Sequence, residues 1–180
     1  EHMFPGAITW EDWSTIIDAY VDDLIASLRH DCPEPVLADM FALSEDYLNL
    51  KRAVLNRTPF QFVPRVFSEA RLLEVASGTP NLLPDVIRPA VAQLTALGAD
   101  AQDLATVDLV LDGAYLRHYL ALARGVNAPM VLSWATERVL NKAISALWRA
   151  VRAGMNRKEL EQRFLPINGI NGILKDMLEA

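Results

Sequence analysis

Two neighbouring stretches decide the fold: AQDLATVDLVLDGAYLRHYLALAR at residues 101–124 and MVLSWATERVLNKAISALWRAVRA at residues 130–153. Each predicts a long α-helix, and Gly125 and Pro129 between them predict the turn of an antiparallel hairpin. Apolar residues occupy more than one face of both helices, so each helix must be covered on several sides. Either both helices lie at the centre of a bundle, or a second copy covers one face. We expect a homodimer through 101–124 and 130–153.

The rest of the chain carries helical start and stop signals and almost no strand-like alternation. Thr9 with Asp12 predicts a capping box for a helix over residues 9–30, and a second helix is expected over residues 35–56. The apolar positions of the first recur at helical spacing: Trp13, Ile16, Ile17, Tyr20, Leu24 and Leu28. Further capping signals predict helix starts at Thr58, Asp100 and Asn156. The sequence therefore predicts an all-α bundle of about eight helices.

Residues 58–98 contain five prolines within a helical pattern. Because proline removes a backbone donor and kinks a helix, we expect kinked helices that pack loosely against the hairpin and leave a cavity. Large aromatic residues on both segments could line that cavity, although core packing is the simpler interpretation. The candidate ligand-binding residues are the aromatic Phe60, Phe67, Tyr115 and Trp134, with Asp112 or Arg117 as a polar anchor.

A charged group interrupts the apolar helix at 101–124. Asp108 and Asp112 lie one turn apart on one face, and Arg117 and His118 follow about a turn and a half later. Three interpretations stay open: an ion pair across a dimer interface, a polar anchor in a ligand cavity, or solvent exposure. The ion pair is favoured, because buried charges are usually paired and structural.

The composition is that of one ordinary domain of 180 residues, 52% hydrophobic and 22% charged, with a formal net charge of −6. A chain of this length buries roughly two thirds of its unfolded surface, so it needs no metal or disulfide to fold. The single cysteine, Cys32, excludes an internal disulfide, and charges interrupt every long apolar run, so we expect a cytoplasmic protein. Residues 1–3 are interpreted as an expression-vector remnant, and residues 4–180 as one helical domain, which a longer protein could contain.

No sequence pattern typical of an enzyme is found. His30 and His118 lack the spacing that puts two metal ligands on one helical face. There is no glycine-rich phosphate loop or Gly-x-Ser-x-Gly turn, and Cys32 near His30 lacks a third group to orient the pair. We therefore expect no catalysis, no metal and no cofactor.

Charge is distributed unevenly along the chain. Residues 1–50 contain eleven acidic residues and one basic residue, whereas residues 131–165 carry a net charge of +4. The basic segment after Gly154 resembles the opening of a helix-turn-helix, but Lys175 is the only base of the helix that would read DNA, so DNA contact is not expected. Such polarity suits surfaces that bind partner proteins.

The stretches LTALGADAQDLA at 94–105 and VLDGAY at 110–115 place a glycine at a helix end, an acidic cap after it and a glycine within the long helix. Over residues 85–150 this order resembles the C-terminal ligand-binding and dimerisation domain of tetracycline-repressor-family regulators. That family's N-terminal DNA-binding helix-turn-helix has no counterpart before Trp10. The resemblance implies an effector half that binds small, mainly apolar molecules and thereby changes the spacing of two DNA-reading heads.

Two functions from different classes are therefore expected. The first is a small-molecule-sensing and dimerisation domain of a transcriptional regulator, in which a ligand favours one helix arrangement over another. The alternative is a helical protein–protein interaction module of a larger assembly, with neither a small ligand nor catalysis.

Overall fold

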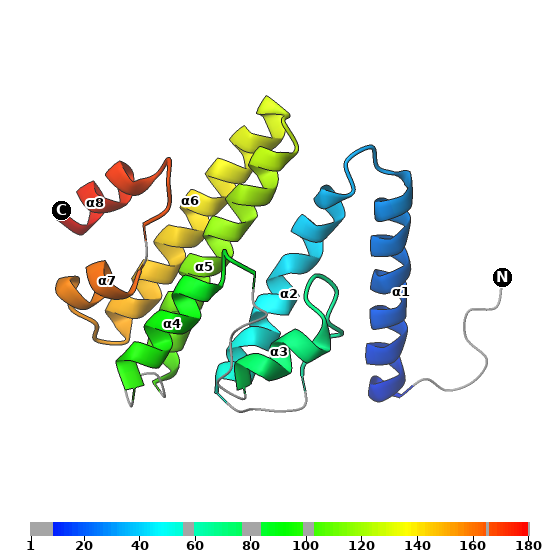
Figure 1. Cartoon of the computed structure of the whole chain (residues 1–180), viewed down its shortest axis with the longest axis horizontal. Helices are drawn as coiled ribbons and strands as arrows, with labels where there is room; N and C mark the ends of the chain where they lie inside the picture. The colour runs from blue at the N-terminus through cyan, green and yellow to red at the C-terminus, as the bar shows by residue number, and fades with distance from the viewer. Residues whose placement is uncertain (1–8, 56–59, 77–83, 99–102, 165, 180) are drawn as a thin grey trace.

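The computed structural model describes residues 9–55, 60–76, 84–98, 103–164 and 166–179, and within these ranges the chain forms eight helices and no strand. In chain order the helices are α1 (Trp10–Asp31), α2 (Val36–Val54), α3 (Glu69–Ala76), α4 (Arg88–Leu97), α5 (Leu104–Gly125), α6 (Pro129–Arg152), α7 (Arg157–Arg163) and α8 (Asn171–Glu179). The predicted all-α class is confirmed, and α5 and α6 lie side by side as the long antiparallel hairpin (Figure 1).

Local capping signals set most helix ends. The Thr9–Asp12 and Asn156–Glu159 capping boxes both form, so α1 and α7 begin where the sequence predicts. The predicted start of α5 is wrong: Asp103 is its N-cap, because its carboxylate accepts hydrogen bonds from the amides of residues 105 and 106. Asp100 lies outside the described residues.

The predicted helix that begins at Thr58 does not form over residues 60–68, whereas α3 and α4 do form within the predicted range 58–98, and Gly98 ends α4 as expected. Thr58 lies outside the described residues, and residues 60–68 form an irregular segment before α3. Side chains of α2 make the hydrogen bonds that the backbone of this segment needs. The buried Asp46 carboxylate accepts hydrogen bonds of 2.5–2.9 Å from the amides of residues 65, 66 and 67. The Asn49 side chain accepts from the amides of residues 61 and 62 and donates to the carbonyl of residue 62. Since these polar groups replace the hydrogen bonds that a helix would make, the segment needs no helix.

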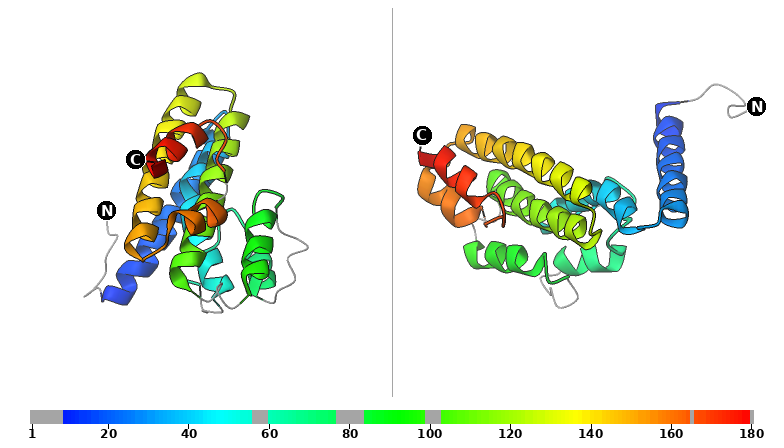
Figure 2. Two further views of the ribbon diagram at one scale, coloured as in Figure 1. Left: turned by 90° about the vertical axis from the view of Figure 1, so that its left-hand side faces the viewer. Right: turned by 90° about the horizontal axis from the view of Figure 1, so that it is seen from above.

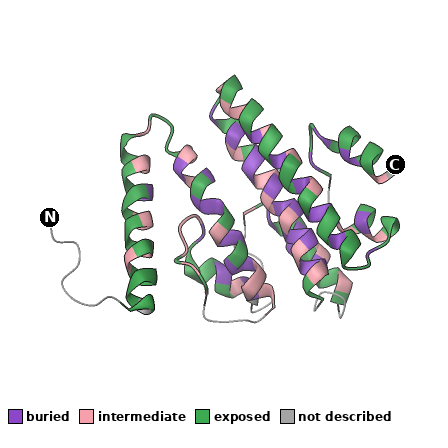
Figure 3. Ribbon diagram, turned by 180° about the vertical axis from the view of Figure 1, so that it is seen from behind, coloured by how far each residue is buried: buried purple, intermediate pink, exposed green. Residues whose placement is uncertain are grey.

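The central element of the body is α5. It packs against α2, α4, α6 and α7, and buried residues lie on more than one of its faces (Figure 3). By contrast, α6 buries one face against α5 and exposes the other. The chain itself therefore covers the second apolar face of α5, which the sequence analysis assigned to a partner copy. Most of the exposed large apolar side chains of the hairpin lie on α6, and Leu104 at the start of α5 is also about half exposed.

The helix α1 stands at one end of the molecule, with α7 and α8 at the other (Figures 1 and 2). Its contact with α2 is a small separate core in which Ile25 packs with Ala38 and Ala42. Arg65, almost fully buried, ties the two helices together by pairing with Asp22 of α1 and Glu45 of α2. No helix in the described ranges is long and apolar enough to cross a membrane.

Candidate functional site

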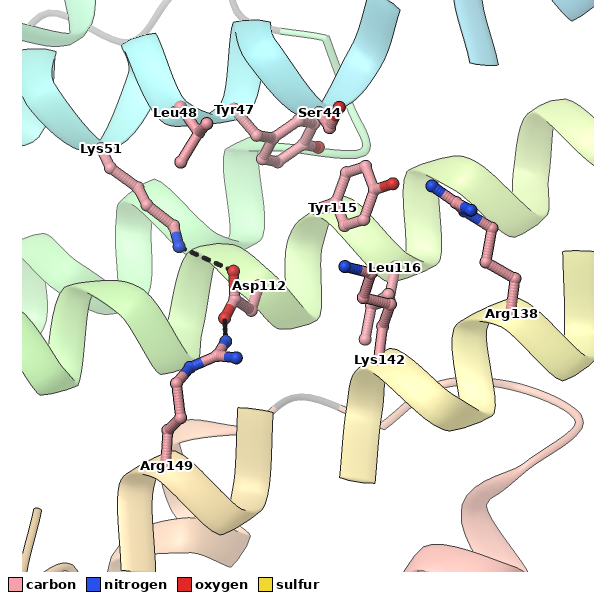
Figure 4. Close-up of a pocket in the computed structure, with 10 residues that line it drawn as sticks. All are labelled: Ser44, Tyr47, Leu48, Lys51, Asp112, Tyr115, Leu116, Arg138, Lys142 and Arg149. Carbon is pink, nitrogen blue, oxygen red and sulfur yellow. Dashed lines mark hydrogen bonds and ion pairs between the residues drawn. The ribbon is translucent and has the colours of Figure 1, made fainter. Parts of the chain in front are cut away.

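A pocket of about 280 Å³ lies where α2, α5 and α6 meet (Figure 4). Three helices contribute to its wall: Ser44, Tyr47, Leu48 and Lys51 from α2, Asp112, Tyr115 and Leu116 from α5, and Arg138, Lys142 and Arg149 from α6. Two of the six predicted ligand-binding residues, Asp112 and Tyr115, are among them. The wall combines a buried aromatic and aliphatic floor with four basic side chains.

The acid in this pocket is already ion-paired within the chain. Asp112 accepts from Lys51 Nζ of α2 at 2.7 Å and from Arg149 Nη2 of α6 at 2.6 Å. The same Lys51 ammonium lies 2.9 Å from Asp108. These contacts link α2, α5 and α6 without a second copy. The ion pair expected across a dimer interface is therefore formed inside one chain.

Arg138 of α6 lies over two aromatic rings, one on α5 and one on α6. The Arg138 guanidinium lies 5.8 Å from the centre of the Tyr119 ring and 5.7 Å from that of Trp134. Burial raises the pKa of Tyr115, and Arg138 only partly opposes this, so the phenol is neutral at pH 7. Trp134 itself is about half exposed and lines a neighbouring surface groove.

The other predicted ligand-binding residues do not reach this pocket. Phe67 is buried against His118 and Tyr47, with ring centres 5.9 and 5.8 Å away. Phe60 packs on the main core from the irregular segment. Arg117 lies beside Gly113 and is half-buried, which lowers its pKa from the usual value. The six residues thus belong to several environments rather than to one cavity.

His118 on α5 is largely buried, and burial lowers its pKa to about 4, with Asp39 opposing weakly. The unfolded imidazole titrates near pH 6.5, so the folded chain holds the neutral form more strongly. The contribution of His118 to the free energy of unfolding is therefore fully present above pH 6.5 and is lost as the pH falls towards 4.

We expect the free energy of unfolding to fall by about 2 kcal/mol between pH 7 and pH 5 through His118 alone. Burial raises the pKa of Glu45 and Asp46, which acts in the opposite direction, so the difference from His118→Gln is the quantity to measure. Urea unfolding at both pH values gives it, with the exposed His30→Gln as control. An identical pH dependence in His118→Gln and the wild type would contradict this assignment.

Sequence reasoning missed the basic side of the pocket. Arg138, Lys142 and Arg149 recur along α6 at spacings of four and seven, which is a recognisable signal for one helical face. Nothing in the sequence, however, shows that Lys51 and Tyr47 of α2 lie opposite them. Those contributions depend on the packing of α2 on α5.

A row of exposed apolar side chains runs along α1. Five large side chains at spacings of three and four are between 40 and 90% exposed: Trp10, Trp13, Ile17, Tyr20 and Leu24. We call these five residues the α1 stripe. Most of the residues that the sequence analysis took as the apolar positions of helix 9–30 thus face solvent. The contact with α2 uses Val21, Ile25 and Leu28, about 100° further round the helix.

The remaining polar candidates of the sequence, Cys32 and His30, lie at the C-terminal end of α1. No group of three or more His, Cys, Asp or Glu side chains in the described part of the chain could hold a metal ion. Cys32 is a half-buried free thiol at the end of α1, and the exposed His30 pairs with Asp31 at 2.7 Å.

These features define an all-α helical-bundle protein with a basic pocket in its body and an apolar stripe on its first helix. No family model, curated protein or solved structure matches the chain. The basic pocket and the α1 stripe are therefore the two candidate functional surfaces.

Proposed function

We propose that the chain is a helical protein–protein interaction module that binds its partner through the α1 stripe. The observation that carries the proposal is the exposure of five large apolar side chains in one row along α1, whose described contacts with α2 and with residues 65 and 66 lie on another face of the helix. Single exposed apolar residues are ordinary, but a contiguous row at helical spacing is typical of a binding surface. Tryptophan and tyrosine, three of the five, are also the residue types enriched at the centres of interfaces.

The partner is a helix with an apolar face and basic residues along its border. The exposed Asp12 and Asp23 lie on α1 beside the stripe, and residues 1–50 carry ten more negative than positive charges. An amphipathic helix binds such a row through its own apolar face, and flanking charges of opposite sign select the partner. Two aspartates introduced into the α1 stripe, with two aspartates elsewhere on α1 as the control, test this proposal.

A homodimer is a separate proposal. Since the chain itself covers most of α5, a homodimer through the hairpin would use mainly the outer side of α6. Met130, Trp134 and Trp148 are exposed there among basic residues. That surface has the chemistry proposed for the partner of α1, so a second copy is one possible outcome of the same experiment.

The second candidate function is small-molecule sensing by a transcriptional regulator. It is favoured by one observation, the pocket that brings Asp112 and Tyr115 together between three packed helices. A ligand there would bias the spacing of α2 and α6, which both contact α5. It ranks second because the predicted ligand-binding residues are dispersed and because Asp112 already has two ion-pair partners.

A further inference from the structure

We propose that the pocket between α2, α5 and α6 binds a small organic anion. The inference rests on this pocket alone and does not depend on a partner for α1. It gives the second candidate function a ligand class different from the mainly apolar molecules that the family resemblance implies.

Positive charge is concentrated here in a chain that is negative as a whole. Four basic side chains line the pocket against the single acid Asp112, although the whole chain has a formal net charge of −6. Like charges brought together in a concave site repel one another and raise the local concentration of anions. A cluster of positive side chains in a negatively charged protein therefore favours an anionic ligand.

Two of the four basic groups form no ion pair with an acidic side chain in the part of the chain that the structure describes. Lys51 and Arg149 are paired with Asp112, and Lys51 also with Asp108. Arg138 and Lys142 form no ion pair within the described ranges. Figure 4 shows both side chains extending from α6 towards Tyr115 and α2. They are placed to hold one carboxylate or phosphate between them.

The floor of the pocket suits the organic part of such a ligand. Tyr47 and Leu116 are buried, and Tyr115 is half-buried with its ring centre 5.5 Å from that of Tyr47 in an edge-to-face arrangement. A flat ring can pack on these groups while its acidic substituent faces α6. The volume of about 280 Å³ lies at the small end of the range for small-molecule sites, so the ligand is compact.

Benzoate is a suitable probe, with the neutral benzamide as its isosteric control and inorganic phosphate as an anion without a ring. We expect millimolar benzoate to raise the Tm of the wild type, because a ligand that binds only the folded state stabilises it. Benzamide and phosphate should have much smaller effects. Raising the ionic strength should weaken the benzoate effect, since salt screens exposed charges.

Lys142→Glu should weaken benzoate binding roughly tenfold in isothermal titration, whereas Lys158→Glu on α7 makes the same change in net charge and should leave it unchanged. Arg138→Gln is a second pocket variant, which should also weaken benzoate binding. The Tm of each variant in buffer without benzoate shows whether the variant is folded. Equal stabilisation by benzamide, or equal benzoate affinity in wild type and both pocket variants, would overturn the proposal. Phosphate binding as strong as benzoate binding would also overturn it, because the floor would then contribute nothing.

Discussion

Asp46→Ala is expected to lower the free energy of unfolding by about 3–4 kcal/mol, a large effect for a single substitution. The carboxylate of Asp46 is fully buried and accepts three backbone hydrogen bonds from residues 65–67. Removing it leaves three amide donors in the segment that leads into α3 without their acceptor. Each buried donor that loses its partner costs about 1–3 kcal/mol, and water entering the segment reduces the total.

Urea unfolding followed by circular dichroism measures this loss, and two variants calibrate it. Asp46→Asn keeps one acceptor oxygen and should lose about half as much. Asp39→Ala removes a carboxylate whose ion pair with Arg29 is partly exposed, and should cost less than about 1 kcal/mol. A loss in Asp46→Ala no greater than in Asp39→Ala would show that the segment does not depend on this carboxylate.

The second large effect is expected on assembly rather than on stability. Ile17→Asp combined with Leu24→Asp places two charges in the middle of the α1 stripe, and should abolish partner binding because a buried unpaired charge is costly. Both residues are about half exposed in the chain alone, so the free energy of unfolding should change by less than about 1 kcal/mol. Ile25→Asp, on the face that packs against α2, should instead destabilise the fold by about 2–4 kcal/mol.

Helix identity could be predicted from the sequence where the signals are local. Such signals act between residues a few positions apart. The structure forms the predicted capping boxes at Thr9 and Asn156 and the two long helices α5 and α6. The irregular segment at 60–68 could not be predicted, because the groups that hold it are Asp46 and Asn49 of the preceding helix. Hydrogen bonds from α2 therefore stabilise an irregular backbone at 60–68, although the sequence there has a helical pattern of apolar residues and prolines.

The candidate sites depended even more on packing. Periodicity identified an apolar side of α1, but it could not show that α2 would contact an adjacent face and leave the α1 stripe exposed. In the same way, apolar residues all round α5 indicated burial on several sides without showing that α2 and α4 of the same chain provide it. The pocket likewise requires three helices to be placed before its basic wall can be recognised.

The most direct test of the interaction function is the size of the native complex that contains this protein. Size-exclusion chromatography of extracts from cells that produce it at its natural level compares the wild type with Ile17→Asp/Leu24→Asp and with the matched control Ala19→Asp/Ala26→Asp, whose exposed positions lie elsewhere on α1. We predict that wild type and control elute in a larger complex and that the stripe variant, still folded, elutes as the free chain. Elution of all three proteins at the same size would contradict the account.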